Sequence, residues 1–364
     1  MILHRYFAIR FLKAFAGVFA IFALIMTFLD LVEQLRKFAN TEATFADIVG
    51  LTMLNVPQGI YAILPLIMII ATITLFLGLS RSSEMVVTRA AGRSAVQALL
   101  SPLLMAFLIG VLGIVMMNPI VAATTKAFEV RSNAFKGEDR VLSLGSTGLW
   151  LRQGDGDSQT VIRAEAANLD GTELRNATFI SFTPEGTPIE RIAAAQATLT
   201  AGAWQLADAK IWQLSGVRTP ETTAKVTDRH ALPSTLTADQ IRDSFGTPSS
   251  IPIYELPDFI ERLKAAGFSA QRHQVWFQTE LAMPVFLVAM VMIGASFTMR
   301  HQRGGRTGLM VLFAILLSFG TYFVRNFAAI LGENGQLPAA LAAWAPPIAA
   351  IGIAMGFLLH KEDG

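Results

Sequence analysis

Residues 80–93 form a short polar segment between two long apolar blocks. The helix dipole favours an acid in the first turn of a helix, and glycine often ends one, so Glu84 and Gly92 fit the two ends of a short helix. Met85 would lie on its apolar side, and Glu84 and Arg89 on its polar side. The segment is either a solvated interfacial helix or a coupling helix that inserts into a cytoplasmic motor.

A second group of ionisable residues follows the first apolar block, where Asp30 and Glu33 precede Arg36 and Lys37. Arginine can bind a phosphate through two parallel hydrogen bonds, and lysine attracts one as a point charge. Arg325 lies within the fifth apolar block, and charged residues inside membrane spans often mark a substrate path. These basic residues are candidates for an anion site, or they extend to the membrane interface and act only as anchors.

The chain lacks the motifs that enzymes and cofactor sites use. It contains no GxxxxGK[ST] loop for a nucleotide and no GxSxG nucleophile motif. Its five histidines form no HxxxH pair, and the absence of cysteine excludes disulfides and thiolate metal sites. A net charge of +2 is too small to indicate nucleic-acid binding. We therefore expect no catalytic residue, no metal and no cofactor in this chain.

Six apolar blocks position these residues. The 364 residues are 53% hydrophobic and only 15% charged, whereas about a quarter of the residues in soluble proteins are charged. A bilayer-spanning helix needs about 20 mostly apolar residues. We expect six spans, near residues 11–31, 57–79, 95–117, 281–299, 308–331 and 338–359.

Lysine and arginine in the flanking loops indicate the orientation, because cytoplasmic loops carry an excess of them. The two sides of the membrane differ: one carries Arg36 and Lys37, and the other carries Arg5, Arg10, Lys13, Arg81, Arg89, Arg93, Arg300, Arg303, Arg306 and Lys361. We expect both termini in the cytoplasm and the long insertion, residues 126–278, outside it.

The insertion shows the two-residue period of strands. Residues 148–163 alternate around a turn at 154–157, and further alternating runs follow as far as residue 214. This spacing predicts an antiparallel sandwich or jellyroll. Residues 233–252 indicate a returning linker, and Pro257 opens an amphipathic helix. The domain is either an inert spacer or exposes a sheet edge that pairs with a partner's sheet.

Several short motifs occur in a characteristic order. QLRK (34–37) follows the first span, VP (56–57) opens the second, SEMVV and RAAG (83–92) follow the second, and LKAAG (263–267) precedes the fourth. Together they resemble the LptF/LptG permease family of the lipopolysaccharide exporter, its LptG branch in particular. The resemblance covers essentially the whole chain, including the length of the insertion.

The resemblance implies an α-helical membrane protein with six transmembrane helices and an inserted antiparallel β-jellyroll. Residues 1–125 would hold spans one to three with a coupling helix at about 81–92, residues 126–278 a periplasmic domain, and residues 279–364 spans four to six. It also implies a complex in the Gram-negative inner membrane. The partners would be an LptF-like second permease, an LptB-like ATPase dimer that uses ATP and Mg²⁺, and an LptC-like single-span jellyroll protein.

The resemblance also assigns roles to the candidate residues. The family's coupling glutamate falls on Glu84, with Met85 and Arg89 beside it. Its basic residues that face the phosphates of lipid A match Arg36 and Lys37. Arg325 is not matched in this way; as a charged residue inside a span it is a candidate for the same pocket, or it extends to the interface. Asp30 is a departure, because LptG proteins can carry lysine there and an acid repels a phosphate.

The predicted function is that of an LptG-like permease subunit in an ATP-driven lipopolysaccharide extractor. One alternative is a secondary transporter that works alone, and another is a scaffold that presents the β domain. Secondary transporters usually have broken helices or internal repeats. Neither is clear in this sequence, in which Pro65 and Pro284 are the nearest signs of a broken span.

Overall fold

A computed structural model of the chain describes residues 2–90, 95–136, 143–145, 148–154, 159–168, 171–183, 186–216, 219–234, 236–237, 241, 247–265, 269–299 and 307–362. The chain divides into two compact units. Unit 1 comprises Met1–Lys136, Ser249–Tyr254 and Gln271–Gly364, and unit 2 comprises Gly137–Pro248 and Glu255–Ala270.

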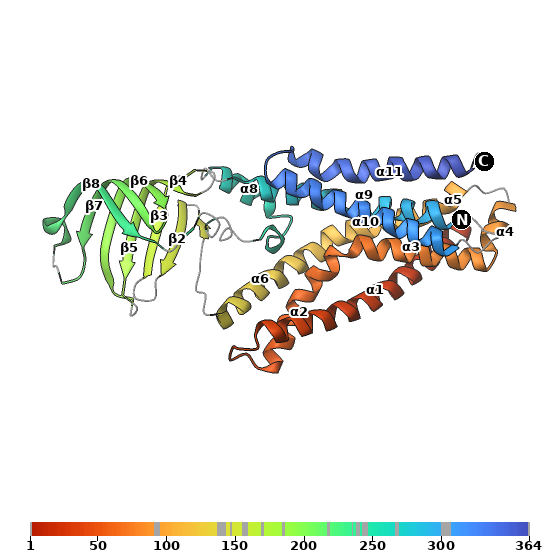
Figure 1. Cartoon of the computed structure of the whole chain (residues 1–364), viewed down its shortest axis with the longest axis horizontal. Coiled ribbons are helices and arrows are strands. Elements are labelled where there is room, and N and C mark those ends of the chain that lie inside the picture. Colours follow the sequence, from red (N-terminus) through yellow and green to blue (C-terminus); the bar gives the residue numbers. More distant parts are fainter. Residues whose placement is uncertain are drawn as a thin grey trace. The chain divides into compact units, whose positions relative to one another are not determined.

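Unit 1 is a bundle of long helices (Figure 1). They are α1 (Ile2–Lys37), α2 (Phe45–Ala62), α3 (Leu64–Arg81), α4 (Glu84–Ala90), α5 (Ala95–Leu112), α6 (Asn118–Lys136), α9 (Gln271–Thr298), α10 (Thr307–Glu333) and α11 (Ala339–Glu362). A π-helical turn, η1 (Gly113–Met117), joins α5 to α6. Within the described residues, six stretches are long and apolar enough to cross a membrane, which confirms the expectation of six spans.

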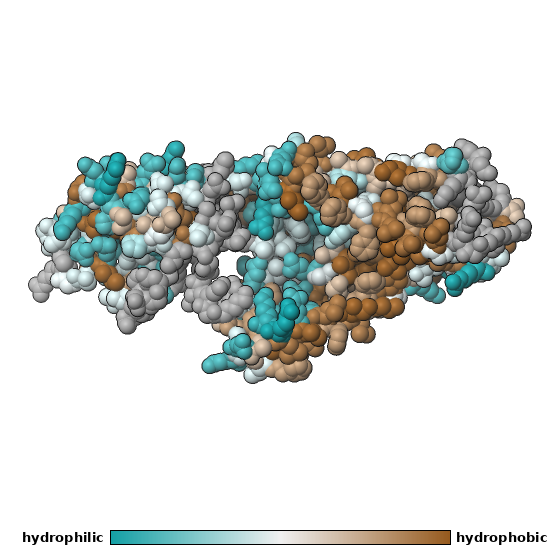
Figure 2. Space-filling view, viewed as in Figure 1, coloured by the Kyte–Doolittle hydropathy of each residue, from teal (hydrophilic) through white to brown (hydrophobic). Residues whose placement is uncertain are grey.

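Helix α9 forms the centre of unit 1 and packs against α3, α5, α10 and α11. Its contact with α5 requires a glycine, because a Cβ atom at Gly110 would lie 2.5 Å from the Cα of Pro284. Apolar side chains also cover much of the face of unit 1 that Figure 2 shows. Leu24 of α1, for example, is 73% exposed. Such a surface is typical of helices that face lipid.

Two irregularities interrupt the expected spans. The second span, predicted at residues 57–79, is divided between α2 and α3 at Ile63. The break arises because Pro65 has no N–H to donate to the carbonyl of Tyr61. The second irregularity is η1, where the helix adopts the wider π form. Such turns are rare and often occur at functional sites.

Unit 2 contains one antiparallel sheet. Its strands are β1 (Ser143–Gly145), β2 (Gly148–Gly154), β3 (Gln159–Ala164), β4 (Ala166–Ala167), β5 (Glu173–Phe182), β6 (Pro188–Thr200), β7 (Ala203–Gln213) and β8 (Lys225–Pro233). They are ordered β1-β2-β3-β5-β6-β7-β8, with β4 paired to β5. Two 3-10 turns, η2 (Pro220–Thr223) and η3 (Pro248–Ser250), and helix α8 (Leu256–Ala265) follow β7 along the chain. The inserted antiparallel β domain is confirmed, and its jellyroll form stays a prediction.

The sheet is held by the alternation seen in the sequence. The predicted hairpin pairs β2 with β3, so that Leu151 lies opposite Ile162, and both side chains are buried. Residues 155–158 of its turn lie outside the described residues. Farther along the sheet, Phe179 meets the buried Trp204 edge-on, with 6.0 Å between ring centroids. Packing alone therefore accounts for the core of a domain without cysteine.

The predicted domain limits fall inside helices. Residue 126 lies within α6, which continues to Lys136, and residue 278 lies within α9. The segment Ser249–Tyr254, which includes the last four residues of the predicted returning linker (233–252), belongs to unit 1. The membrane bundle therefore holds more of the chain than hydropathy alone indicates.

Candidate functional site

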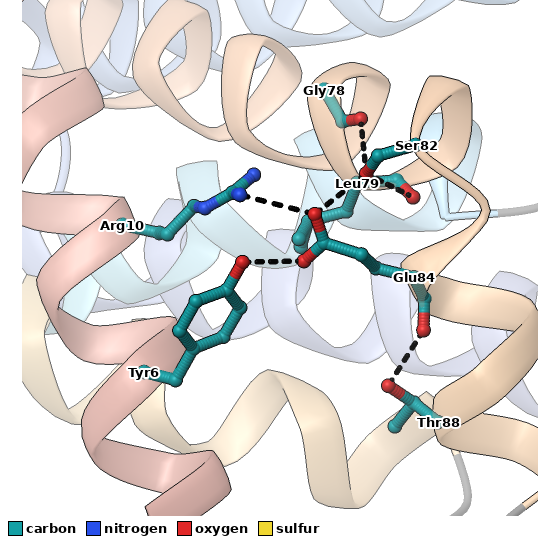
Figure 3. A network of polar contacts seen from close by, with 7 residues as sticks. All are labelled: Tyr6, Arg10, Gly78, Leu79, Ser82, Glu84 and Thr88. Atoms are coloured by element: carbon teal, nitrogen blue, oxygen red, sulfur yellow. Dashed lines mark hydrogen bonds and ion pairs between the residues drawn. The ribbon is translucent and has the colours of Figure 1, made fainter.

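The Glu84 carboxylate, at the start of α4, is the centre of a polar cluster (Figure 3). Its Oε2 atom accepts a hydrogen bond from the hydroxyl of Tyr6 at 2.6 Å. Its Oε1 atom accepts from the hydroxyl of Ser82 at 2.8 Å and lies 3.0 Å from the guanidinium of Arg10. We call these four residues the Glu84 cluster.

Local geometry explains how the Glu84 cluster forms. Tyr6 and Arg10 are four residues apart on α1, so both side chains lie on one face of that helix. The Arg10 guanidinium lies 5.0 Å from the centre of the Tyr6 ring, a stacking that orients both groups. Ser83, with a φ of 59°, makes the tight turn from α3 into α4. The Ser83 carbonyl then accepts from the amide of Val87, in the first turn of α4.

The cluster keeps Glu84 ionised. Burial of this carboxyl raises its pKa, but the hydrogen bonds from Tyr6 and Ser82 and the charge of Arg10 outweigh that effect. The net result is a pKa below the ordinary value for glutamate. Glu84 is therefore an anion at neutral pH.

The rest of α4 presents an apolar surface. Met85 is only 2% exposed and packs in the core of unit 1. Val86 and Val87 point outward, and Val87 is 68% exposed. The side chain of Arg89 and the residue Gly92 lie outside the described residues. A partner at α4 would thus contact the two valines. Met85, on the opposite side, packs the helix against the bundle.

Arg36 and Lys37, the outer cation pair, end α1 and are both exposed. Lys37 Nζ lies 5.9 Å from the centre of the Phe128 ring on α6, a cation–π contact. Cations are also favoured at the C-terminal end of a helix by its dipole. The position suits the binding of an anion, and the phosphate role stays a prediction.

Asp30, the departure noted above, is turned toward α2. Its Oδ1 atom accepts from the Asn55 amide at 2.6 Å and from the Gln34 amide at 3.2 Å. The carboxylate therefore serves the contact between α1 and α2. The sequence did not reveal Asn55 as the partner of Asp30, because the residues around Asn55 give no sign that it contacts an acid in another helix.

Arg325 has a different group of contacts in unit 1. Its guanidinium lies 4.9 Å from the centre of the Phe286 ring, within electrostatic reach of Glu280. Glu280 accepts a hydrogen bond from Tyr61. The described contacts of Arg325 are thus with a different group of residues from those of Lys37, which lies by Phe128. A pocket shared by Arg325 and the outer cation pair stays a prediction.

Glu280 is the residue that sequence reasoning missed most clearly. It is 2% exposed and accepts hydrogen bonds from the Tyr61 hydroxyl at 2.5 Å and the Asn118 amide at 3.1 Å. The side-chain oxygen of Asn118, Oδ1, in turn accepts from the backbone amide of Ile253 at 2.9 Å. A signal was present, because three apolar residues, Val275, Trp276 and Phe277, lie upstream of Glu280, before the predicted start of the fourth span.

Known proteins resemble this chain along nearly its whole length. A profile of the family described as "Lipopolysaccharide export system permease LptF/LptG" matches residues 5–361. The lipopolysaccharide export system permease protein LptG of Haemophilus influenzae is 25% identical over 366 aligned residues, which cover 94% of this chain and 96% of the relative. LptG of Escherichia coli K12 is 22% identical over 352 residues, covering 91% of this chain and 90% of the relative. The chain therefore belongs to the LptF/LptG family of lipopolysaccharide export system permeases.

Proposed function

We propose that this chain is the LptG-like permease subunit of an ATP-driven complex that extracts lipopolysaccharide from the inner membrane. A second, LptF-like permease would pair with it, an LptB-like ATPase dimer would bind ATP and Mg²⁺, and an LptC-like protein would extend the periplasmic bridge. The observation that carries the proposal is α4. This short helix follows a span directly, is anchored by Met85, and exposes Val86 and Val87 to a partner.

The energetics of extraction support a separate motor. Each methylene group that leaves the bilayer costs about 0.8 kcal/mol, so a lipid with many acyl chains needs an external energy source. The sequence has no nucleotide-binding loop. ATP is therefore hydrolysed by the partner, and this chain receives force at α4.

The orientation follows from the distribution of basic residues. With both termini and α4 in the cytoplasm, unit 2 lies in the periplasm and the outer cation pair at the periplasmic end of α1. Arg36 and Lys37 would then bind the phosphates of lipid A. Arg325, beside Phe286 and Glu280, would act as a further contact on the lipid path.

The exchange Glu84→Arg tests the proposal. Purified wild-type chain should bring with it stoichiometric ATPase and lipopolysaccharide, both measured by mass spectrometry, and release lipid when ATP is added. Glu84→Arg should lose ATP-driven release. Glu42→Arg, the same exchange at an exposed residue between α1 and α2, is the matched control. Lipid movement by the chain alone, without a nucleotide-binding companion, would instead support a secondary transporter.

A further inference from the structure

The Glu84 carboxylate has three donors within its own chain (Figure 3). Oε2 accepts from Tyr6 of α1, and Oε1 faces both Ser82, at the end of α3, and Arg10 of α1. Both carboxylate oxygens thus have charged or hydroxyl donors at 2.6–3.0 Å. A cation from another protein would share the carboxylate with these donors, because its two oxygens offer about four acceptor sites.

We propose that Tyr6 and Arg10 are positioning residues that fasten α4 to α1 through Glu84, so that movement of α4 is transmitted first to α1. This inference rests on the proposed function, in which a motor moves α4. Hydrogen bonds to an ionised carboxylate are shorter and stronger than neutral ones. Because two residues of one helix hold the same carboxylate, they fix its direction as well as its distance.

This arrangement divides the surface of α4 between two tasks. Val86 and Val87 are exposed and meet the motor, whereas Met85 and Glu84 face the bundle. Glu84 therefore joins α4 to the bundle of its own chain. The assignment differs from one in which the glutamate forms an ion pair with the ATPase.

Helix α1 is suited to carry the movement onward. It runs for 36 residues without a proline, a length of about 54 Å. Its start is firmly held, because Phe7 and Phe11 are buried and His4 Nδ1 lies 2.9 Å from the hydroxyl of Ser101. In its most apolar stretch only 6% of the residues are buried within the chain. The other end carries the outer cation pair, so one rigid helix joins α4 to the predicted phosphate contacts.

A charge exchange separates this inference from direct contact between Glu84 and a motor cation. Complexes with the ATPase, in proteoliposomes that contain lipopolysaccharide, are compared for wild type, Arg10→Glu, Glu84→Arg and the double variant. Contacting charges usually couple strongly enough for about a tenfold effect. We expect each single variant to release about tenfold less lipid per ATP hydrolysed, and the double variant to regain most of that loss.

The control is Lys13→Glu, the same charge change at an exposed position of α1, which should behave like wild type. Normal release by the single variants would overturn the inference. So would a double variant that performs no better than Glu84→Arg, because Glu84 would then act through a cation of the motor.

Tyr6→Phe tests the contact between α1 and Glu84 by a second route, because the phenylalanine ring preserves the packing of α1. The variant removes only the phenolic hydroxyl, so the ATPase should co-purify as with wild type while lipid release per ATP falls severalfold. Release equal to wild type would contradict the inference. Failure of the proposed function looks different, because the wild-type chain would then purify without an ATPase. The contact between Arg10 and Glu84 could still be measured in that case. Arg10→Glu should lower the melting temperature of the chain relative to wild type, and the double variant should restore it.

Discussion

The hydroxyl of Tyr61, near the end of α2, donates a hydrogen bond to the buried carboxylate of Glu280 in α9 at 2.5 Å. Hydrogen bonds between membrane helices contribute about 0.6 kcal/mol on average and about 1.7 kcal/mol at most. We therefore expect Tyr61→Phe to lower the free energy of unfolding by about 1 kcal/mol, measured by denaturant titration in detergent. A loss several times larger would show that the hydroxyl supports more than this one bond.

Removal of the Glu280 carboxylate should cost much more than removal of its donor. Glu280→Ala leaves Arg325 without the nearby opposite charge, and an uncompensated buried charge costs about 3–5 kcal/mol. The double variant Glu280→Ala/Arg325→Met should recover most of this loss in the same unfolding assay. Losses that simply add would show that the two charges do not compensate each other.

Gly110 is expected to tolerate no side chain. A Cβ atom there would lie 2.5 Å from the Cα and 2.9 Å from the Cβ of Pro284, so Gly110→Ala must separate α5 from α9. Overpacking of this kind typically costs about 1–3 kcal/mol. Gly320→Ala, in α10, meets no atom within 4 Å and should stabilise its helix by up to about 1 kcal/mol. Thermal unfolding of the two variants should shift in opposite directions.

The start of α2 should respond to acid. Hydrogen bonds from the side chain and backbone of Thr44, and then from Arg131, hold the pKa of Asp47 below its ordinary value of 3.8. A lowered pKa in the folded state stabilises the fold fully above the ordinary value, and this contribution is lost as the pH falls through the folded value.

The stability difference between wild type and Asp47→Asn should therefore be constant at neutral pH and shrink below about pH 3.8. Melting temperatures at a series of pH values measure it. Glu42→Gln, at an exposed position two residues before Thr44, provides the comparison. A difference that grows on acidification would contradict the assigned contacts.

The outer cation pair should bind lipid independently of Arg325. With a photo-crosslinker at the exposed residue Asn40, the double variant Arg36→Glu/Lys37→Glu should reduce lipopolysaccharide crosslinking about tenfold or more, because each basic residue near an anionic headgroup contributes about 1 kcal/mol. Arg325→Gln should leave this signal unchanged, since the described contacts of Arg325 are with Phe286 and Glu280. Equal losses in both variants would place all three cations in one pocket.

The sequence was informative where one physical variable dominates. Bilayer thickness sets the length of a span, so six apolar blocks identified six helices, and a period of two residues identified the hairpin at residues 148–163. The helix that begins at Glu84 was found because an acid in a first turn and a change in polarity are local signals.

Contacts between distant residues could not be found this way. Asp30 and Asn55 are 25 positions apart, and Tyr61 and Glu280 are 219 apart, so no spacing rule connects them. Pro65 was visible in the sequence, but only the structure shows that it ends one helix and starts another. The Tyr6 and Arg10 contacts with Glu84 depend likewise on the packing of α1 against the α3–α4 turn.

The π-helical turn η1 accommodates one residue more than an α-helical turn of the same height. The Val115 carbonyl in this turn accepts a hydrogen bond from the Tyr254 hydroxyl at 3.1 Å, and Asn118 follows directly with its bond to Glu280. Deleting one residue here would let the turn close to ordinary α-helical geometry, because a π-helical turn is an α-helical turn with one residue inserted. The helix beyond it would keep its phase and Asn118 its approach to Glu280, whereas the Val115 carbonyl would lose the wide turn in which it meets Tyr254. The extra residue thus serves the bond to Tyr254 and not the course of the helix as a whole.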